Sequence, residues 1–117
     1  MTAPNIVNVA TITGKTAVQA VGTSAAAIVT NPGSSNKVFK INALYVSNVD
    51  GTASADVNVS IQRSGTDYHI AKTVNVPSDS TLDVISKSLY LEEGDALRLL
   101  ASSASDLEAV CSYEEIS

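Results

Sequence analysis

The motif with the clearest chemical suggestion is Gly14-Lys15-Thr16, because Gly-Lys-[Ser/Thr] ends the phosphate-binding P-loop. A P-loop also needs an earlier glycine, at the position of Val9, that lets the backbone curl around phosphate. Residues 17–22 lack the pattern of a helix that could aim its N-terminus at a ligand. The sequence therefore predicts no nucleotide site, and it favours a hairpin turn at Gly14-Lys15 with a solvent-facing Lys15.

His69 and Cys111 are each the only residue of their kind, which limits metal and nucleophilic chemistry. A catalytic zinc site uses three protein ligands, and the chain has no Gly-x-Ser-x-Gly nucleophile elbow for a Ser-His-Asp triad. We expect His69 on a strand surface. We expect Cys111 to be a buried small hydrophobe, because a reactive thiol needs nearby positive charge and its sequence neighbours are acidic. A single cysteine also excludes an intrachain disulfide, which suits folding in a reducing cytoplasm.

Carboxylates gather at a turn with Glu92, Glu93 and Asp95, and again at Glu114 and Glu115. Paired carboxylates can carry out acid–base catalysis or bind calcium. Glycosidase pairs usually sit in an aromatic-lined cleft, however, and the chain has no tryptophan. We interpret both groups as solvated turns.

Residues 48–52, Asn-Val-Asp-Gly-Thr, place oxygen ligands at alternate positions but lack the rest of an EF-hand loop. Together with Tyr45, Tyr68, Tyr90 and Tyr113, the acidic turns leave a carbohydrate- or calcium-binding adhesion module open as an alternative. We assign no residue as catalytic, cofactor-binding or metal-binding. The sequence therefore predicts a non-enzymatic protein without a cofactor.

The 117 residues fit one domain, which we predict to span residues 1–117. Hydrophobic residues make up 44% of the chain but aromatic residues only 4%, so Val, Ala, Ile and Leu must form the core. The abundant β-branched and short polar residues favour strands over helices. The net charge of −5 and the few aromatic residues predict no nucleic-acid partner, because an acidic surface repels phosphate.

No stretch approaches the roughly 20 apolar residues that span a membrane. Residues 1–11 contain neither a basic region nor a long apolar run. We therefore expect no signal peptide and no membrane partner.

Alternating apolar and polar residues predict strands along the whole chain, and turn signals recur about every 8–12 residues. This pattern is typical of sandwiches and barrels. We predict an all-β fold, a single antiparallel β-sandwich or jelly-roll-like domain of about 8–10 short strands. The expected strands are residues 5–13, 16–21, 25–30, 37–48, 55–63, 67–76, 81–85, 87–91, 96–101 and 107–116.

The strand over residues 37–48 has an unusual pattern. Phe39, Ile41, Ala43 and Tyr45 lie on one side and are all apolar, whereas the other side becomes apolar only towards its end. This pattern predicts a central strand that changes from half-buried to buried.

Residues 1–33 are less regular, and two alternatives remain for them. They form part of the sandwich, or they form an arm that packs on a neighbouring subunit.

The segments KVFKINALYVSNVDG, ADVNVSIQRSGTDYHIAKTVNVP, STLDVISKSLYLEEGDALRLLAS and LEAVCSYEEI resemble small structural proteins of tailed bacteriophages, particularly marine phages. The resemblance covers most of residues 37–117. Residues 91–99, LEEGDALRL, are similar to the Leu-x-x-Gly-Asp-x-Leu-x-Leu turn common in viral β-sandwich modules. In that turn the glycine and aspartate reverse the chain and the leucines enter the core.

This resemblance implies a virion component. It favours a capsid decoration or cement protein, with a head–tail neck, tail or fibre component as the alternative. The implied partners are further copies of the chain, with a trimer as the expected order, and the major capsid protein or other virion proteins. The implied location is the virion, after assembly in the bacterial host cytoplasm. Short strands with unpaired edges agree with this class, because such edges invite pairing with neighbours.

Overall fold

The computed structural model describes residues 9–117, which form nine strands and no helix. Six strands lie within one residue of their predicted bounds, whereas β1, β6 and β7 differ from them by more. The strands are β1 (Ile12–Ala20), β2 (Ala26–Thr30), β3 (Val38–Asn48), β4 (Ala55–Arg63), β5 (Thr66–Val76), β6 (Thr81–Asp83), β7 (Leu89–Leu91), β8 (Ala96–Ala101) and β9 (Leu107–Ile116). No helix that could cross a membrane occurs in this part of the chain.

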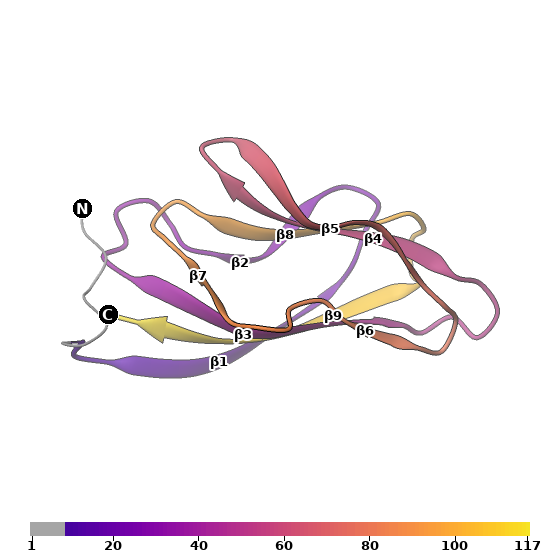
Figure 1. Cartoon of the computed structure of the whole chain (residues 1–117), viewed down its shortest axis with the longest axis horizontal. Helices are drawn as coiled ribbons and strands as arrows, with labels where there is room; N and C mark the ends of the chain where they lie inside the picture. Colours follow the sequence, from indigo (N-terminus) through magenta and orange to yellow (C-terminus); the bar gives the residue numbers. More distant parts are fainter. Residues whose placement is uncertain (1–8) are drawn as a thin grey trace.

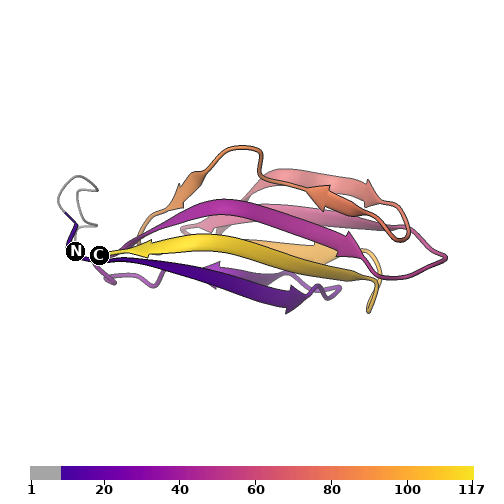
Figure 2. The same ribbon diagram turned by 90° about the horizontal axis from the view of Figure 1, so that it is seen from below.

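The strands form two antiparallel sheets that face each other (Figure 1). The first sheet has the order β1-β9-β3-β6, with β7 also paired to β3, and the second has the order β2-β8-β4-β5. The pairing is nested: the first strand pairs with the ninth, the second with the eighth, the third with the sixth and seventh, and the fourth with the fifth. The predicted antiparallel β-sandwich is confirmed, and β1 forms one edge of the first sheet (Figure 2).

Alternate residues of both sheets meet in one core. Leu97 and Leu99 of β8 are 0% and 1% exposed, so the leucines of the turn motif do enter the core. Leu44 of β3 and Cys111 of β9 face them from the first sheet and are fully buried. Burying one such leucine contributes about 1.5–3 kcal/mol, and the aliphatic side chains together must outweigh the lost chain entropy.

A β-bulge in β3 changes which residues face the core. The register of β3 with β9 shifts between Ile41 and Ala43, which places an extra residue on β3 and reverses its alternation. Phe39 and Ile41 are buried before the shift, whereas Leu44 is buried and Tyr45 is exposed after it. The prediction of one apolar side through Tyr45 is therefore wrong beyond the bulge.

The predicted hairpin turn at Gly14-Lys15 is also wrong. β1 runs through both residues, and all nine of its residues pair with β9 in one uninterrupted register. A continuous ladder satisfies the backbone groups of the segment better than a local turn would, and it overrides the turn preference of glycine.

The N-terminal third contributes strands to both sheets, because β1 lies in the first sheet and β2 in the second. Residues 1–8 lie outside the described residues. The arm predicted for residues 1–33, so far as it involves residues 1–8, and the assignment of one domain to residues 1–117 stay predictions.

Candidate functional site

Lys15 of the Gly-Lys-Thr motif forms an ion pair within the first sheet. Its Nζ lies 2.9 Å from Oε2 of Glu115, while Nζ of Lys37 lies 2.5 Å from Oε1 of the same carboxylate. Hydrogen bonds from Lys37 and Lys15 lower the pKa of Glu115. Lys15 is exposed, as predicted, and its charge is compensated by Glu115 on the neighbouring strand β9.

The acidic turn before β8 is organised around Asp95, whose side chain is only 2% exposed. Arg63 at the end of β4 donates hydrogen bonds to both carboxylate oxygens, and the Glu92 backbone N–H donates to Oδ2 at 2.9 Å. Arg63 holds the pKa of Asp95 below its usual range. The turn is therefore not simply solvated as predicted, since its central carboxylate is buried and bound by a guanidinium.

Glu92 shares the guanidinium of Arg63 with Asp95, because its Oε2 lies 2.9 Å from the same Nη2 that binds Asp95. Glu93 accepts a hydrogen bond from the backbone N–H of Asn36 at 3.1 Å. Glu114 stands opposite Gly14 and Lys40 in the ladders of β9 with its two neighbours. Glu92 and Asp95 are thus joined through one arginine, whereas Glu93 is bound to a backbone N–H.

Residues 48–52 form a tight loop between β3 and β4. Oδ1 of Asp50 accepts hydrogen bonds from the backbone N–H and the hydroxyl of Thr52, at 2.8 and 2.9 Å, and these bonds lower the pKa of Asp50. Desolvation and the adjacent Asp50 raise the pKa of Asp106. Across residues 9–117, no three acidic, histidine or cysteine side chains lie close enough to hold a metal ion.

Two buried asparagines hold the loops at the ends of the sandwich, and the sequence reasoning did not single out either amide. Asn31 donates from Nδ2 to the carbonyls of Lys37 and Leu91, at 2.9 and 3.0 Å. Asn48 donates from Nδ2 to the carbonyls of Ala53 and Val76, each at 2.9 Å. The available signal was their position at the start of Pro/Gly-rich or Asp-Gly loops, where short polar side chains commonly bond the backbone.

His69 is exposed and Cys111 is buried, as predicted. His69 is exposed on β5, opposite Ser60 of β4. Cys111 is a free thiol with 0% exposure, and burial raises its pKa to about 11. A thiol with this pKa is almost entirely protonated at neutral pH and is a poor nucleophile.

The four tyrosines do not gather into one surface. Tyr113 stacks on Phe39 inside the first sheet, with ring centroids 5.7 Å apart. Tyr45 and Tyr90 are exposed on strands of the first sheet, whereas Tyr68 is exposed on β5 of the second. This arrangement gives no support to the alternative of a carbohydrate-binding module.

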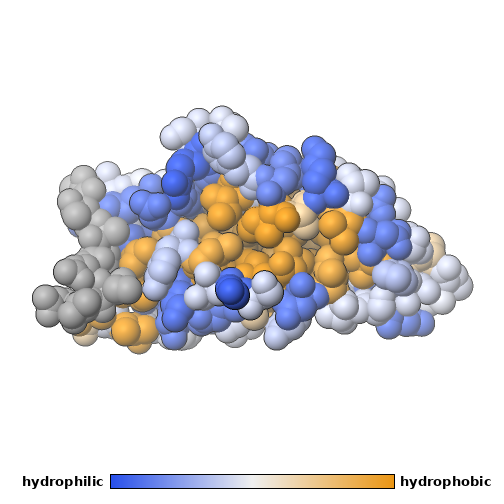
Figure 3. All heavy atoms as spheres, in the orientation of Figure 1, coloured by the Kyte–Doolittle hydropathy of each residue, from blue (hydrophilic) through white to orange (hydrophobic). Residues whose placement is uncertain are grey.

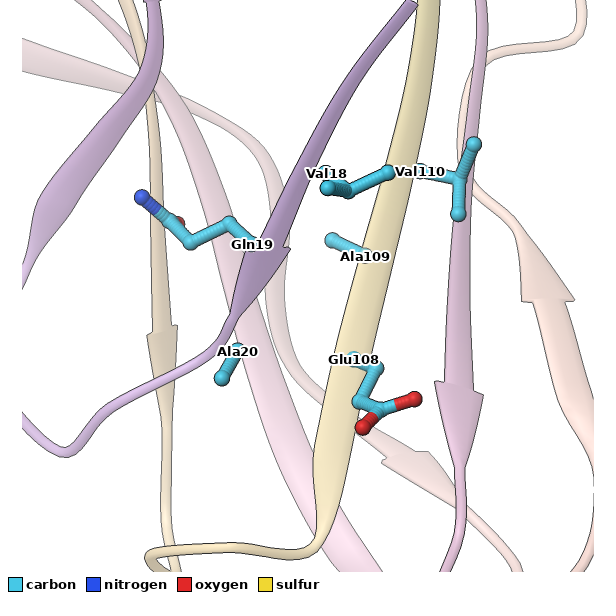
Figure 4. A pocket seen from close by; sticks show the side chains of 6 residues that line it. All are labelled: Val18, Gln19, Ala20, Glu108, Ala109 and Val110. Carbon is cyan, nitrogen blue, oxygen red and sulfur yellow. The ribbon is translucent and has the colours of Figure 1, made fainter.

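One apolar row crosses the outer surface of the first sheet and ends at its edge. Val18 of β1 stands opposite Val110 of β9, which stands opposite Tyr45 of β3. These side chains are 75%, 41% and 44% exposed. Figure 4 shows Val18 extending toward Val110. Both residues line a shallow hollow of about 310 Å³, and Glu108 also lines it.

A second apolar surface lies where the two sheets separate. The face in Figure 3 shows a band of hydrophobic residues between hydrophilic margins, on the side where β5 and the short strands β6 and β7 end the two sheets. The partly buried Val74, Leu82 and Leu89 of these strands pack against the core. This side of the sandwich is therefore only partly covered.

The sequence matches no known protein family and no curated protein. Solved structures with a similar fold include Bacillus endospore appendages, described as a family of disulfide-linked pili. The TM-score is 0.55 and the identity 18%, over 92% of this chain and 88% of that chain. At this identity the likeness establishes a shared fold.

A pentameric capsid protein isolated from metagenomic phage sequences is also similar, with a TM-score of 0.44 and 17% identity. The match covers 86% of this chain and 60% of that chain, so this chain spans less than two thirds of the capsid protein. A likeness at this level carries no argument about function.

Proposed function

We propose that this chain is a non-enzymatic structural subunit of a larger assembly, a virion component of a tailed bacteriophage. The main support for the proposal is that the buried and clustered polar side chains of this chain bind other groups of the same chain. Arg63 holds Asp95, and Glu115 holds two lysines. Asn31 and Asn48 hold loop carbonyls at the two ends. These contacts stiffen the sandwich, and the carboxylates of Asp95 and Glu115 are each bound by neighbouring cations.

The architecture supports this role. The nested strand order of the two sheets resembles that of a jelly roll, an architecture that occurs in viral capsid domains. The endospore appendage with a similar fold forms pili, so a sandwich of this kind can serve in an extended assembly. The resemblance of residues 91–99 to a turn of viral sandwich modules favours a virion over an appendage.

Within the virion, we place the chain first as a capsid decoration or cement protein that forms a homo-oligomer on the major capsid protein. A neck, tail or fibre component is the alternative. The trimer predicted from the sequence stays a prediction about its order.

The proposed assembly is non-covalent, unlike the disulfide-linked pili of the appendage. The only cysteine of this chain, Cys111, is fully buried in the core, and burial raises its pKa. A cross-link through this thiol would require the sandwich to open.

The test combines protein analysis of purified phage particles with electron microscopy of the isolated chain. The proposal expects the chain in particles at many copies, and ordered oligomers of the purified protein. A stable monomer that is absent from particles would contradict it.

A further inference from the structure

One edge of β1 pairs with no other strand among residues 9–117. Ser117 and Thr11 exchange backbone hydrogen bonds at 2.9 and 3.0 Å, and Val21 donates to the carbonyl of Leu107 in the same register. Because hydrogen-bonded pairs recur at every second residue of an antiparallel ladder, odd-numbered residues of β1 bond to β9. The even-numbered residues turn their N–H and C=O groups outward, and no strand among residues 9–117 pairs with them. They are Ile12, Gly14, Thr16, Val18 and Ala20.

The other described sheet edges are interrupted or short. The register of β5 with β4 shifts twice, and Thr73 within β5 has a φ of 53°. The ladder of β2 with β8 also has a shift, and β6 and β7 have three residues each. Irregular or short edges resist pairing with other chains, whereas a long regular edge invites it. The edge most suited to strand addition is therefore that of β1.

The side chains of β1 permit this pairing. Lys15 is the only charged residue of β1. Its ammonium is bound to Glu115 of β9, so it does not lie along the free edge. The residues with free backbone groups include Val18 and Ile12, which are 75% and 56% exposed. A strand added here would cover apolar surface as well as satisfy backbone groups.

We propose that β1 pairs antiparallel with β1 of a second copy of this chain, about a twofold axis through Thr16. This register sets Gly14 opposite the second copy's Val18 and Lys15 opposite its Ala17. The neighbouring register, with Ile12 opposite Val18, would place the two Lys15 residues directly opposite each other, where like charges repel. The first sheets of the two copies then form one continuous sheet. This interface rests on the proposed self-assembly and specifies its contact.

Charge substitutions at Thr16 test both the interface and its register. Thr16 is exposed, so Thr16→Lys and Thr16→Glu should keep the thermal midpoint of the wild-type fold. Each variant alone sets like charges on the twofold axis, and the dimer dissociation constant should rise about tenfold or more. A mixture of the two variants should restore a dimer that contains one copy of each. Thr13→Lys is the control, because Thr13 is also exposed on β1 but lies on the other face of the strand, and the proposed register sets it opposite the second copy's Gln19 rather than on the twofold axis.

Sedimentation velocity and native mass spectrometry of the full chain separate the outcomes. Weakened dimers of each single variant, with recovery in the mixture, support the interface. If wild type and Thr16→Lys assemble equally, or if the assembly holds an odd number of copies, the interface is overturned while the proposed function stands. A wild-type chain that stays monomeric at all soluble concentrations overturns the interface, and it overturns the proposed function as well if the chain is also absent from phage particles.

Discussion

Arg63 donates hydrogen bonds to both carboxylate oxygens of Asp95, with Nε 2.8 Å from Oδ1 and Nη2 2.6 Å from Oδ2. The carboxylate is buried, whereas the arginine side chain remains half exposed. This bidentate pair joins the tip of the β4–β5 hairpin to the turn before β8, and thereby fixes two loops of the second sheet.

Replacing Arg63 should destabilise the fold, because the buried Asp95 would lose both guanidinium hydrogen bonds. We expect Arg63→Met to lower the free energy of unfolding by about 1.5–3 kcal/mol, measured by urea denaturation. Glu92→Gln is the control, since Glu92 contacts the same arginine but is 66% exposed. It should cost less than about 1 kcal/mol. Equal losses in the two variants would show that burial of Asp95 does not matter.

Stability should fall in acid because two carboxylates are bound in the folded state. Arg63 lowers the pKa of Asp95, and Lys37 and Lys15 lower that of Glu115. Folded pKa values below the unfolded ones give stabilisation that is complete above about pH 5 and is lost as the pH falls through the folded values.

The urea midpoint, followed from neutral to strongly acidic pH, measures this effect. The loss should begin near the unfolded carboxyl pKa values, and Asp95→Asn should show a shallower decline than wild type. A wild-type midpoint that stays constant through this acid range would contradict the assigned ion pairs.

The core position of Leu97 can be tested against an outward neighbour on the same strand. Leu97 is fully buried, whereas Leu100 is only partly so. Leu97→Ala should reduce the free energy of unfolding by about 2–5 kcal/mol, and Leu100→Ala by clearly less. A neutral Leu97→Ala would mean that the alternation of β8 is assigned to the wrong side.

Cys111 should be unreactive in the native state. Its thiol is fully buried, and its pKa is raised to about 11, so little thiolate forms at neutral pH. A coloured disulfide reagent should label it slowly in buffer and rapidly in denaturant. Rapid labelling of the folded protein would reveal an accessible thiol and would reopen the question of a covalent assembly.

Much of the strand pattern was predictable because local alternation reflects burial in this fold. β4, β8 and β9 begin and end at their predicted residues. In these strands, the residues at every second position are apolar and face the core, and turn residues bound each segment. The sandwich class followed from these regular strands.

Two local features of the backbone depend on pairing with a distant strand, which the local sequence does not predict. Gly14-Lys15 has the composition of a turn, but its pairing with β9 extends the strand through it. The bulge after Ile41 leaves no composition signal, and it turns Tyr45 outward. In both cases, a partner strand distant in sequence determines the local backbone.

The buried polar contacts could not be predicted from the sequence either, because their partners are distant in the chain. Arg63 and Asp95 are 32 residues apart, and only the nested sheet order brings them together. Asn31 and Asn48 appear as ordinary loop residues until their amides are seen to bond carbonyls from other segments. The sequence indicated where turns occur, but it did not indicate which of their side chains become buried.

The central claim is that this chain is a self-assembling structural subunit, and its native mass tests that claim most directly. The mass of the purified full chain should be measured by native mass spectrometry across a range of micromolar concentrations. We expect a defined whole-number multiple of the single-chain mass, and the fraction of the protein in this oligomer should rise with concentration. A single-chain mass at every concentration would contradict it.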